Sequence, residues 1–495
     1  MNRLVKEAVY YARKHLGLEE EDEMYVSNLL LAYFGEKEPY EGEIDTKHID
    51  SLNVPDELVS KIIAHFVELG DDEGLASRKA TYVMGLITPR PSQVIHTFAT
   101  KHAINPADAT DYLYDLCIHN DYIAKTKVDR NEVWKASFDD GSDLEISINL
   151  SKPEKNNKDI AKLLKAPKTT SYPKCLLCYE NVGFEGNDHH PARENIRVIP
   201  LTLGGERWYM QYSPYVYYNQ HCILFYSKHV PMEISAWSMG CLFDFVDQFP
   251  HFYIGSNSDI PIVGGSILNH EHFQGGEHLL PLLLAKDKEV IPSHYKNTKI
   301  SIVDFYDSCI RLTGKDRLEI QAIATEILEK WIHYNDPKHD IIAEDEEGRH
   351  NAITPLVRKN GENYEMTLIL RNNKCNKTYP DGIFHVHPEY QHIKKEGIGL
   401  IEAAGLFILP ARLKRQSKEV EDVIEKGYTK EEYLKIYPDL DNFDDMIKEM
   451  KEKSICSKEY INNVCHNILG NVAVYKNTKE GMEGFKAFLK EITHE

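Results

Sequence analysis

The sequence predicts an α+β protein in which two mixed blocks with antiparallel sheets lie between two helical regions. Residues 1–150 are mainly helical in pattern with one hairpin, and residues 415–495 carry amphipathic helical patterns. The central part carries short β-branched and aromatic runs that are typical of strands. With 495 residues and 42% hydrophobic side chains, the chain is long enough for several domains with buried cores. We therefore expect a lysine-rich linker at 151–174, a first block at 175–300 and a second block at 301–414.

Local signals indicate individual elements of the N-terminal region. Apolar residues recur at helical spacing over Val54–Leu69, and Gly70 ends the pattern. The pair Asn105-Pro106 combines a favoured helix cap with a favoured first helical residue, so a helix is expected to begin there. Residues 122–149 alternate between apolar and polar side chains around Asp140-Gly141, which predicts a β-hairpin with its turn at this pair.

The two central blocks have a similar make-up, which indicates an internal duplication. Each block holds a His-x-His pair, His270 and His272 in the first and His385 and His387 in the second. The expected strands are Ile196–Leu201, Trp208–Tyr212, Cys222–Tyr226, Ile262–Ile267, Ile353–Val357 and Tyr364–Leu370. The expected helices are Ser235–Phe249 and Arg317–Tyr334.

The overall charge and composition argue against several classes of protein. The chain has 58 basic and 78 acidic residues, and a net charge of −20 disfavours general binding to nucleic acid, which depends on neutralising phosphates. No run of 18 apolar residues is available to span a membrane, and no apolar leader follows Met1. Nine cysteines are too few for a disulfide scaffold. We therefore expect a cytoplasmic protein with neither nucleic acid nor membrane as a partner.

The stretch from Gly264 to Gly276 carries the most informative chemistry. If it forms a strand, alternate residues share a face, so His270, His272 and Gln274 line up. The pair Gly264-Gly265 lets backbone N–H groups approach an anion such as a phosphate. Neutral imidazole is abundant at pH 7 and can attack phosphorus without a strong base. The alternative is that both histidines are ordinary buried residues of a strand.

Cys175 and Cys178 have the spacing of a metal-binding pair. In a reducing compartment, Cys-x-x-Cys with distant histidines indicates zinc, which needs two more ligands. His270 is one candidate, and either His229 or His221 is the other. A redox motif is the alternative, although no βαβ pattern surrounds the pair.

The His-x-His-x-Gln run resembles the histidine-triad superfamily, and its glutamine resembles the galactose-1-phosphate uridylyltransferase branch. The likeness to the second, bacterial type of that enzyme extends over nearly the whole chain and implies two histidine-triad-like blocks. It implies the transfer of UMP from UDP-glucose to galactose 1-phosphate, and we also expect a homodimer. The stretches that carry it are Tyr172–Cys178, His190–Arg193, Gln211–Tyr215, Ile254–Asn257, Pro261–Ser266, Arg371–Asn373, Gly382–His385 and Ile408–Lys414.

The resemblance implies roles for residues around the histidine pair. His272 corresponds to the nucleophile that becomes uridylylated, and Gln274 to the glutamine that contacts the transferred phosphate. Asn257 and Ser266 lie near the residues that bind the uridylyl group, although the spacing from Ser266 to the histidines is one residue longer here. The zinc ligands of the better-known branch correspond to Cys175, Cys178, His229 and His270.

Other implied roles lie further along the chain. His350, His385 and His387 fit the order of ligands for a second metal, iron or zinc, with Glu277 as the candidate carboxylate. Lys395 and Glu402 lie where the family contacts the hexose. The basic residues that grip the diphosphate have no clear match near the N-terminus, and Arg90 and Arg193 are the candidates.

The residue types also distinguish transfer from hydrolysis. Gln274 can donate a hydrogen bond to a phosphate oxygen but cannot accept a proton from water, so it favours group transfer. A nucleotide hydrolase or adenylyltransferase of the same superfamily is the nearest alternative. A non-enzymatic nucleotide-sugar sensor is the second, and in that case His272 would support no turnover.

Overall fold

The computed structural model describes residues 1–139, 141–151, 171–187 and 190–493. The chain divides into two compact units, the first comprising Met1–Arg130 with Lys155–His229 and the second Asn131–Glu154 with Val230–Glu495. Most of the expected linker at 151–174, and Asp140 of the expected hairpin turn, lie outside the described residues. The expected α+β class is confirmed, because helices and antiparallel strands are both extensive.

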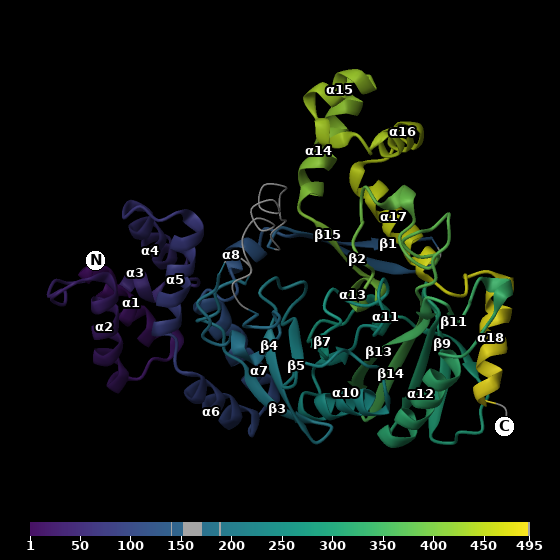
Figure 1. The fold of residues 1–495 in the computed structure, drawn as a ribbon, viewed down its shortest axis with the longest axis horizontal. Coiled ribbons are helices and arrows are strands. Elements are labelled where there is room, and N and C mark those ends of the chain that lie inside the picture. The colour runs from purple at the N-terminus through teal and green to yellow at the C-terminus, as the bar shows by residue number, and fades with distance from the viewer. Residues whose placement is uncertain (140, 152–170, 188–189, 494–495) are drawn as a thin grey trace. The chain divides into compact units, whose positions relative to one another are not determined.

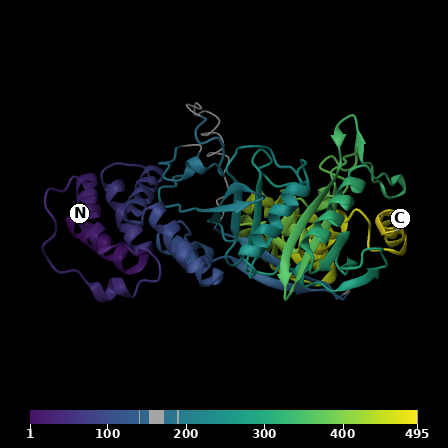
Figure 2. The same cartoon turned by 90° about the horizontal axis from the view of Figure 1, so that it is seen from below.

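The first unit begins with a bundle of helices (Figures 1 and 2). A π-helix, Ala12–Leu16, follows α1 directly, and α4 ends just before Gly70, whose φ is +101°. The Asn105 side chain accepts a hydrogen bond from the Ala107 N–H, so α7 begins where the sequence predicts. The helices are α1 (Asn2–Tyr11), α2 (Glu20–Phe34), α3 (Thr46–Asp50), α4 (Asp56–Glu68), α5 (Glu73–Ile87), α6 (Pro91–His102), α7 (Pro106–His119) and α8 (Lys125–Val128).

A short antiparallel segment of sheet completes the first unit. It consists of β3 (Ile199–Leu203), β4 (Glu206–Tyr212) and β5 (Cys222–Tyr226), paired in that order. The observed β5 matches the expected strand, whereas β3 begins three residues later than expected because residues 196–198 precede the paired region.

The second unit contains a run of antiparallel strands covered by helices. Its order is β7-β6-β13-β14-β10-β9-β8, and both α10 (Ala236–Gln248) and α12 (Arg317–Trp331) pack against it (Figure 1). Both helices lie where the sequence predicts. The strands are β6 (Tyr253–Gly255), β7 (His272–Gly276), β8 (Asp287–Ile291), β9 (Thr298–Val303), β10 (Cys309–Gly314), β13 (Asn351–Asn360) and β14 (Asn363–Asn372), and β11 (Glu344–Asp345) pairs with β12 (Gly348–Arg349) in a separate ribbon.

The expected hairpin forms, but it belongs to the second unit. Strands β1 (Glu132–Ser137) and β2 (Asp143–Asn149) pair antiparallel, and β2 also pairs in parallel with β15 (Leu406–Pro410). This long-range pairing holds the hairpin with the C-terminal part of the chain. Charged helices then follow, as expected: α14 (Arg412–Lys426), α15 (Lys430–Ile436), α16 (Asp444–Lys453), α17 (Ser457–Val472) and α18 (Lys479–Thr493).

One expected strand is absent. Residues 262–267 form turns and irregular structure, with only an isolated bridge between Ser258 and Gly264. The apolar residues here serve packing rather than pairing: Val263 is buried in a small cluster with Ile260 and Ala352.

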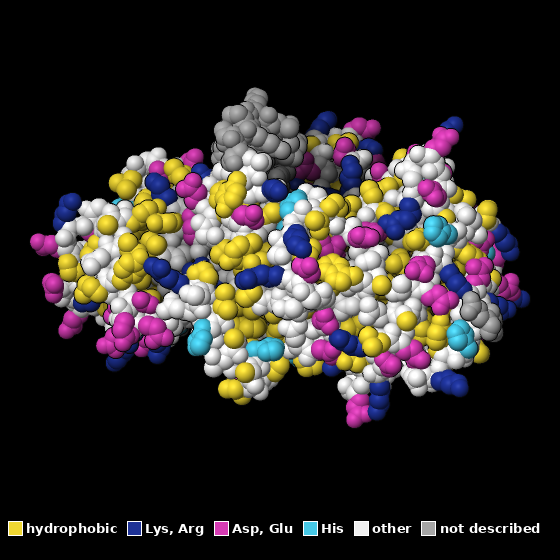
Figure 3. Space-filling view, turned by 60° about the horizontal axis from the view of Figure 1, so that its bottom comes forward, with side chains coloured by type: hydrophobic (Ala, Val, Ile, Leu, Met, Phe, Trp, Pro, Cys, Tyr) yellow, Lys and Arg dark blue, Asp and Glu magenta, His cyan; other side chains and the backbone are white. Residues whose placement is uncertain are grey.

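Charged side chains are distributed over the surface. Acidic and basic side chains are interspersed on the face shown in Figure 3. Over the residues that the structure describes, no helix is both long enough and apolar enough to cross a membrane.

Candidate active site

The predicted nucleophile lies at the first position of β7. His272 is 6% exposed, and its Nδ1 lies 2.8 Å from the backbone oxygen of His270. Because a carbonyl oxygen can only accept, Nδ1 carries the proton and Nε2 keeps its lone pair. Burial lowers the pKa of His272 to about 4, which keeps the ring neutral. The geometry therefore presents an imidazole in the tautomer that a nucleophile requires.

Only part of the expected histidine row lies on the strand. His270 falls in a bend before β7, so the prediction that it shares a strand with His272 is wrong. Gln274 does lie on β7, two residues after His272 and opposite Gly255 of β6. Since alternate strand residues face the same side, His272 and Gln274 share one face of β7.

The glycine pair packs tightly against the chain around Asn257. A Cβ at Gly264 would lie 2.5 Å from the Ser258 carbonyl oxygen, and a Cβ at Gly265 would lie 2.7 Å from Asn257 Nδ2. Neither glycine has room for a side chain, so each allows a close approach of the chain to Asn257 and its neighbours. Ser266, two residues after Gly264, is exposed.

Asn257 connects this loop to the segment expected to contact the hexose. Its side chain is 3% exposed, and Oδ1 accepts a hydrogen bond of 2.8 Å from the Leu400 N–H. Within the same segment, Lys394 Nζ donates to Glu402 Oε1 at 2.9 Å and to the Ile408 carbonyl oxygen at 2.9 Å. Lys395 is exposed. Three of the expected substrate residues, Asn257, Gly265 and Glu402, are thereby linked through short contacts.

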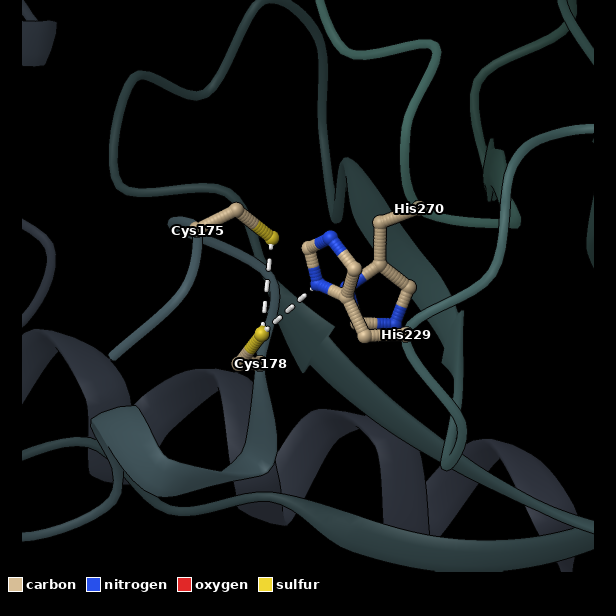
Figure 4. Close-up of side chains that lie close together, drawn as sticks. All are labelled: Cys175, Cys178, His229 and His270. Carbon is tan, nitrogen blue, oxygen red and sulfur yellow. Dashed lines mark hydrogen bonds between the residues drawn. The ribbon is translucent and has the colours of Figure 1, made fainter. Parts of the chain in front are cut away.

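The four predicted zinc ligands lie together (Figure 4). The Cys175 and Cys178 sulfurs are 3.6 Å apart, and Cys178 Sγ lies 3.1 Å from His229 Nδ1. One ligand atom from each of these residues and from His270 lies within 4.8 Å of the others. A tetrahedral site with bonds of about 2.0–2.3 Å places neighbouring ligand atoms roughly 3.5 Å apart. Two thiols and two imidazoles at this separation fit a metal ion and are compatible with zinc.

The choice between two histidines is also resolved. His229 joins this group, whereas the ring of His221 stacks on Tyr217 with centroids 5.1 Å apart. Burial raises the pKa of the Cys175 thiol to about 12, so without a cation the neutral thiol is favoured.

The predicted second metal set is not brought together. Among the described residues, His350 groups with Asp345 and Glu347 instead of with His385 and His387. His385 Nε2 accepts a hydrogen bond of 3.2 Å from the Ile398 N–H, and His387 Nε2 lies 2.9 Å from the Ile383 carbonyl oxygen. Each of these histidines therefore has its Nε2 engaged by the backbone, and neither belongs to a metal-ligating group found among the described residues.

The remaining predicted residues have other neighbours. Arg90 is exposed and donates from Nη2 to the Tyr25 hydroxyl at 2.9 Å, and the Arg193 guanidinium lies 5.4 Å from the centre of the Tyr122 ring. Glu277 is exposed and belongs to neither metal-ligating group found among the described residues.

Two buried residues had no predicted role. Glu271, between the two histidines, is 2% exposed and accepts a 2.7 Å hydrogen bond from the Glu233 N–H. Burial raises the pKa of its carboxyl to about 8. Arg371 is fully buried. It lies in the stretch Arg371–Asn373, whose resemblance to the family is the sequence signal that could have indicated a role for it.

Comparisons with known proteins identify the family of the chain. The family model "Galactose-1-phosphate uridyl transferase, N-terminal domain" matches residues 18–231, and the corresponding C-terminal domain model matches residues 245–433. Relatives named galactose-1-phosphate uridylyltransferase match almost end to end. The chain is 42% identical to that of Caldanaerobacter subterraneus subsp. tengcongensis, with 99% of this chain and 97% of that protein covered.

Two further relatives with the same name match as well. The protein of Clostridium acetobutylicum is 39% identical over 99% of both chains. The protein of Fusobacterium nucleatum is 40% identical over 99% of this chain and 98% of its own length. The chain therefore belongs to the galactose-1-phosphate uridylyltransferase family.

Proposed function

We propose that this protein is a UDP-glucose–hexose-1-phosphate uridylyltransferase that moves UMP from UDP-glucose to galactose 1-phosphate in galactose metabolism. The observation that carries the proposal is His272 on β7, buried, with Nδ1 bound to the His270 carbonyl oxygen and Gln274 on the same face. The names of nearly full-length relatives support the same reaction.

The first half-reaction forms a covalent uridylyl-enzyme. The lone pair on His272 Nε2 attacks the α-phosphorus of UDP-glucose, a new N–P bond forms, and the P–O bond to glucose 1-phosphate breaks. Glucose 1-phosphate leaves as a stable anion, so the step needs no strong general acid. The hydrogen bond from His272 Nδ1 to the carbonyl oxygen of His270 stabilises the positive charge that develops on the ring.

The second half-reaction reverses the first with a new acceptor. A phosphate oxygen of galactose 1-phosphate attacks the uridylyl phosphorus, and the N–P bond to His272 breaks to release UDP-galactose. Gln274 donates from its amide to a phosphate oxygen and offers no basic nitrogen to activate water. We assign uridylyl binding to Asn257, Ser266 and the backbone of Gly264-Gly265.

The hexose phosphate and the diphosphate need further contacts. We assign the hexose to the segment that carries Lys395 and Glu402, because Glu402 is linked through this segment to Asn257. Arg193 and Arg90 stay as candidates for the diphosphate. Residues 175–300 and 301–414 are proposed as the catalytic and the second histidine-triad-like block.

We further propose that Cys175, Cys178, His229 and His270 hold a structural zinc ion. A bound zinc ion would cross-link these segments and so contribute its binding energy to folding. A site for a second divalent ion would use His350 with Asp345 and Glu347, not the predicted set. Thiolate ligands persist in a reducing compartment, which supports a cytoplasmic location. We also propose that the protein forms a homodimer.

Isotope exchange tests the covalent route. Purified protein incubated with UDP-glucose and labelled glucose 1-phosphate, without galactose 1-phosphate, should incorporate label into UDP-glucose. His272→Ala should abolish this exchange while keeping the melting temperature, whereas His333→Ala, at an exposed histidine, should exchange at the wild-type rate. A wild-type protein that forms UDP-galactose without exchange lacks a uridylyl-enzyme. If the wild-type protein only releases UMP from UDP-glucose, it is a hydrolase. If it binds UDP-glucose without turnover, it is a sensor.

A further inference from the structure

The segment from Lys394 to Glu402 is held at Ile398 from two sides. The Ile398 N–H donates to His385 Nε2 at 3.2 Å, and the Ile398 carbonyl oxygen accepts from Arg371 Nη2 at 2.8 Å. Both side chains are buried, His385 at 5% exposure and Arg371 at 0%. One residue is therefore fixed at both its peptide groups by side chains from distant parts of the chain.

The rest of the segment has little freedom to move. The Leu400 N–H binds Asn257 Oδ1, and Lys394 binds Glu402. A Cβ at Gly399 would lie 2.9 Å from Asn257 Oδ1, so the chain already packs closely against that side chain. Loss of the contacts at Ile398 would release the middle of a segment whose ends stay attached.

The contact at His385 also decides which atoms of the ring are available. A neutral imidazole carries one proton, and because Nε2 accepts a hydrogen bond, that proton is on Nδ1. Neither nitrogen then has a free lone pair for a metal ion. The predicted metal role of His385 therefore does not fit, and its hydrogen bond to Ile398 gives it another.

Arg371 makes no other side-chain hydrogen bond among the described residues. Its Nε and Nη1 are buried without a hydrogen-bond partner, as are both carboxylate oxygens of Asp307. Asp307 lies near enough to affect Arg371 electrostatically, yet the two form no hydrogen bond with each other. A buried guanidinium is costly unless it is well paired, and its one fixed contact goes to Ile398.

We propose that Arg371 and His385 are positioning residues that hold Ile398, and thereby set Lys395 and Glu402 for recognition of the hexose 1-phosphate. This inference rests on the proposed uridylyltransferase function. It assigns these two side chains to acceptor affinity and selectivity, without contact to the reacting phosphorus.

Substitutions at His385 test the acceptor atom separately from the ring. His385→Gln keeps an acceptor oxygen close to the position of Nε2, whereas His385→Leu removes it. We expect His385→Leu to raise KM for galactose 1-phosphate about tenfold, the loss that roughly 1.4 kcal/mol of binding represents. The kcat should change much less, and His385→Gln should return KM to within about threefold of wild type. Metal content should match wild type in both variants.

Substitutions at Arg371 give an independent test. Arg371→Lys keeps a buried positive charge near Asp307 but loses the planar guanidinium, so it should fold and still raise KM for galactose 1-phosphate. The matched control is Arg358→Lys on β13, where Arg358 pairs with Glu365 at 2.6 Å, and its KM should equal that of wild type. Circular dichroism and melting temperature verify folding of each variant.

The outcomes separate the inference from the function on which it rests. If the wild-type protein transfers no UMP, the proposed function fails. If it does, a wild-type KM in both Arg371→Lys and His385→Leu overturns the inference alone. Equal losses in His385→Gln and His385→Leu, or a loss of bound metal in either, would assign the ring to a metal and also overturn it.

Discussion

Removing one partner of the buried ion pair between Lys394 and Glu402 should strongly destabilise the second unit. The two side chains are 4% and 12% exposed, and Lys394 Nζ lies 2.9 Å from both Glu402 Oε1 and the Ile408 carbonyl oxygen. Lys394→Met fills a similar volume but leaves a carboxylate and a carbonyl without their donor. Breaking such a pair from one side costs about 3–5 kcal/mol.

This cost should appear in the melting temperature. For a unit of this size each kcal/mol corresponds to about 2 °C, so we expect Lys394→Met to melt at least roughly 6 °C lower. Lys394→Met combined with Glu402→Gln removes both charges and should recover about 1–2 kcal/mol relative to the single variant. Scanning fluorimetry and urea unfolding measure both differences.

A neighbouring lysine supplies the control. Lys395→Met changes the same side chain type at an exposed position, so it should alter stability by less than about 0.5 kcal/mol. The reasoning is refuted if Lys394→Met is as stable as Lys395→Met. It is also refuted if the double variant loses the sum of the two single losses, because that result denies any coupling.

Three further predictions follow from the sites. Cys175→Ser or Cys178→Ser should lower metal content, measured by mass spectrometry, together with the melting temperature, and unchanged metal would contradict the zinc proposal. Gln274→His should raise the ratio of UMP release without acceptor to UDP-galactose formation with it, because a general base can be worth roughly 10²–10⁴-fold; an unchanged ratio would mean that shape excludes water. Burial raises the pKa of Asp121 to about 7, so the folded state disfavours its charged form and stability is lost as pH rises from about 4 to 7. The free energy of unfolding of Asp121→Asn relative to wild type should therefore rise by roughly 2–3 kcal/mol between pH 5 and pH 7.5, and a pH-independent difference would exclude this cause.

Elements with strong local signals were predictable from the sequence. Asn105-Pro106 specifies the start of α7 through a side-chain cap and a fixed φ, both of which act within a few residues. The helical period over residues 317–334 and the apolar and aromatic run at 222–226 likewise match α12 and β5. The thiols of Cys175 and Cys178 lie together because three residues of chain confine them.

Pairings between distant segments were decided by tertiary structure. The apolar run at 262–267 has the composition of a strand, yet it forms turns that pack Val263 against Ile260 and Ala352 and bring Gly264 and Gly265 close to Asn257 and its neighbours. The hairpin of β1 and β2 joins the second unit because β2 pairs in parallel with β15, and no local sequence pattern predicts this pairing.

The sequence by itself determined the family, the helical and mixed regions, and the histidine, glutamine and cysteine residues of the candidate site. Those features depend on residue types at short, fixed spacings. Only the tertiary structure decided what each nitrogen and carboxylate contacts: that His385 binds the Ile398 N–H, that Lys394 pairs with Glu402, and that His350 lies with Asp345 and Glu347. A hydrogen bond of about 3 Å depends on the positions of both partners, and sequence spacing constrains neither when they come from separate elements.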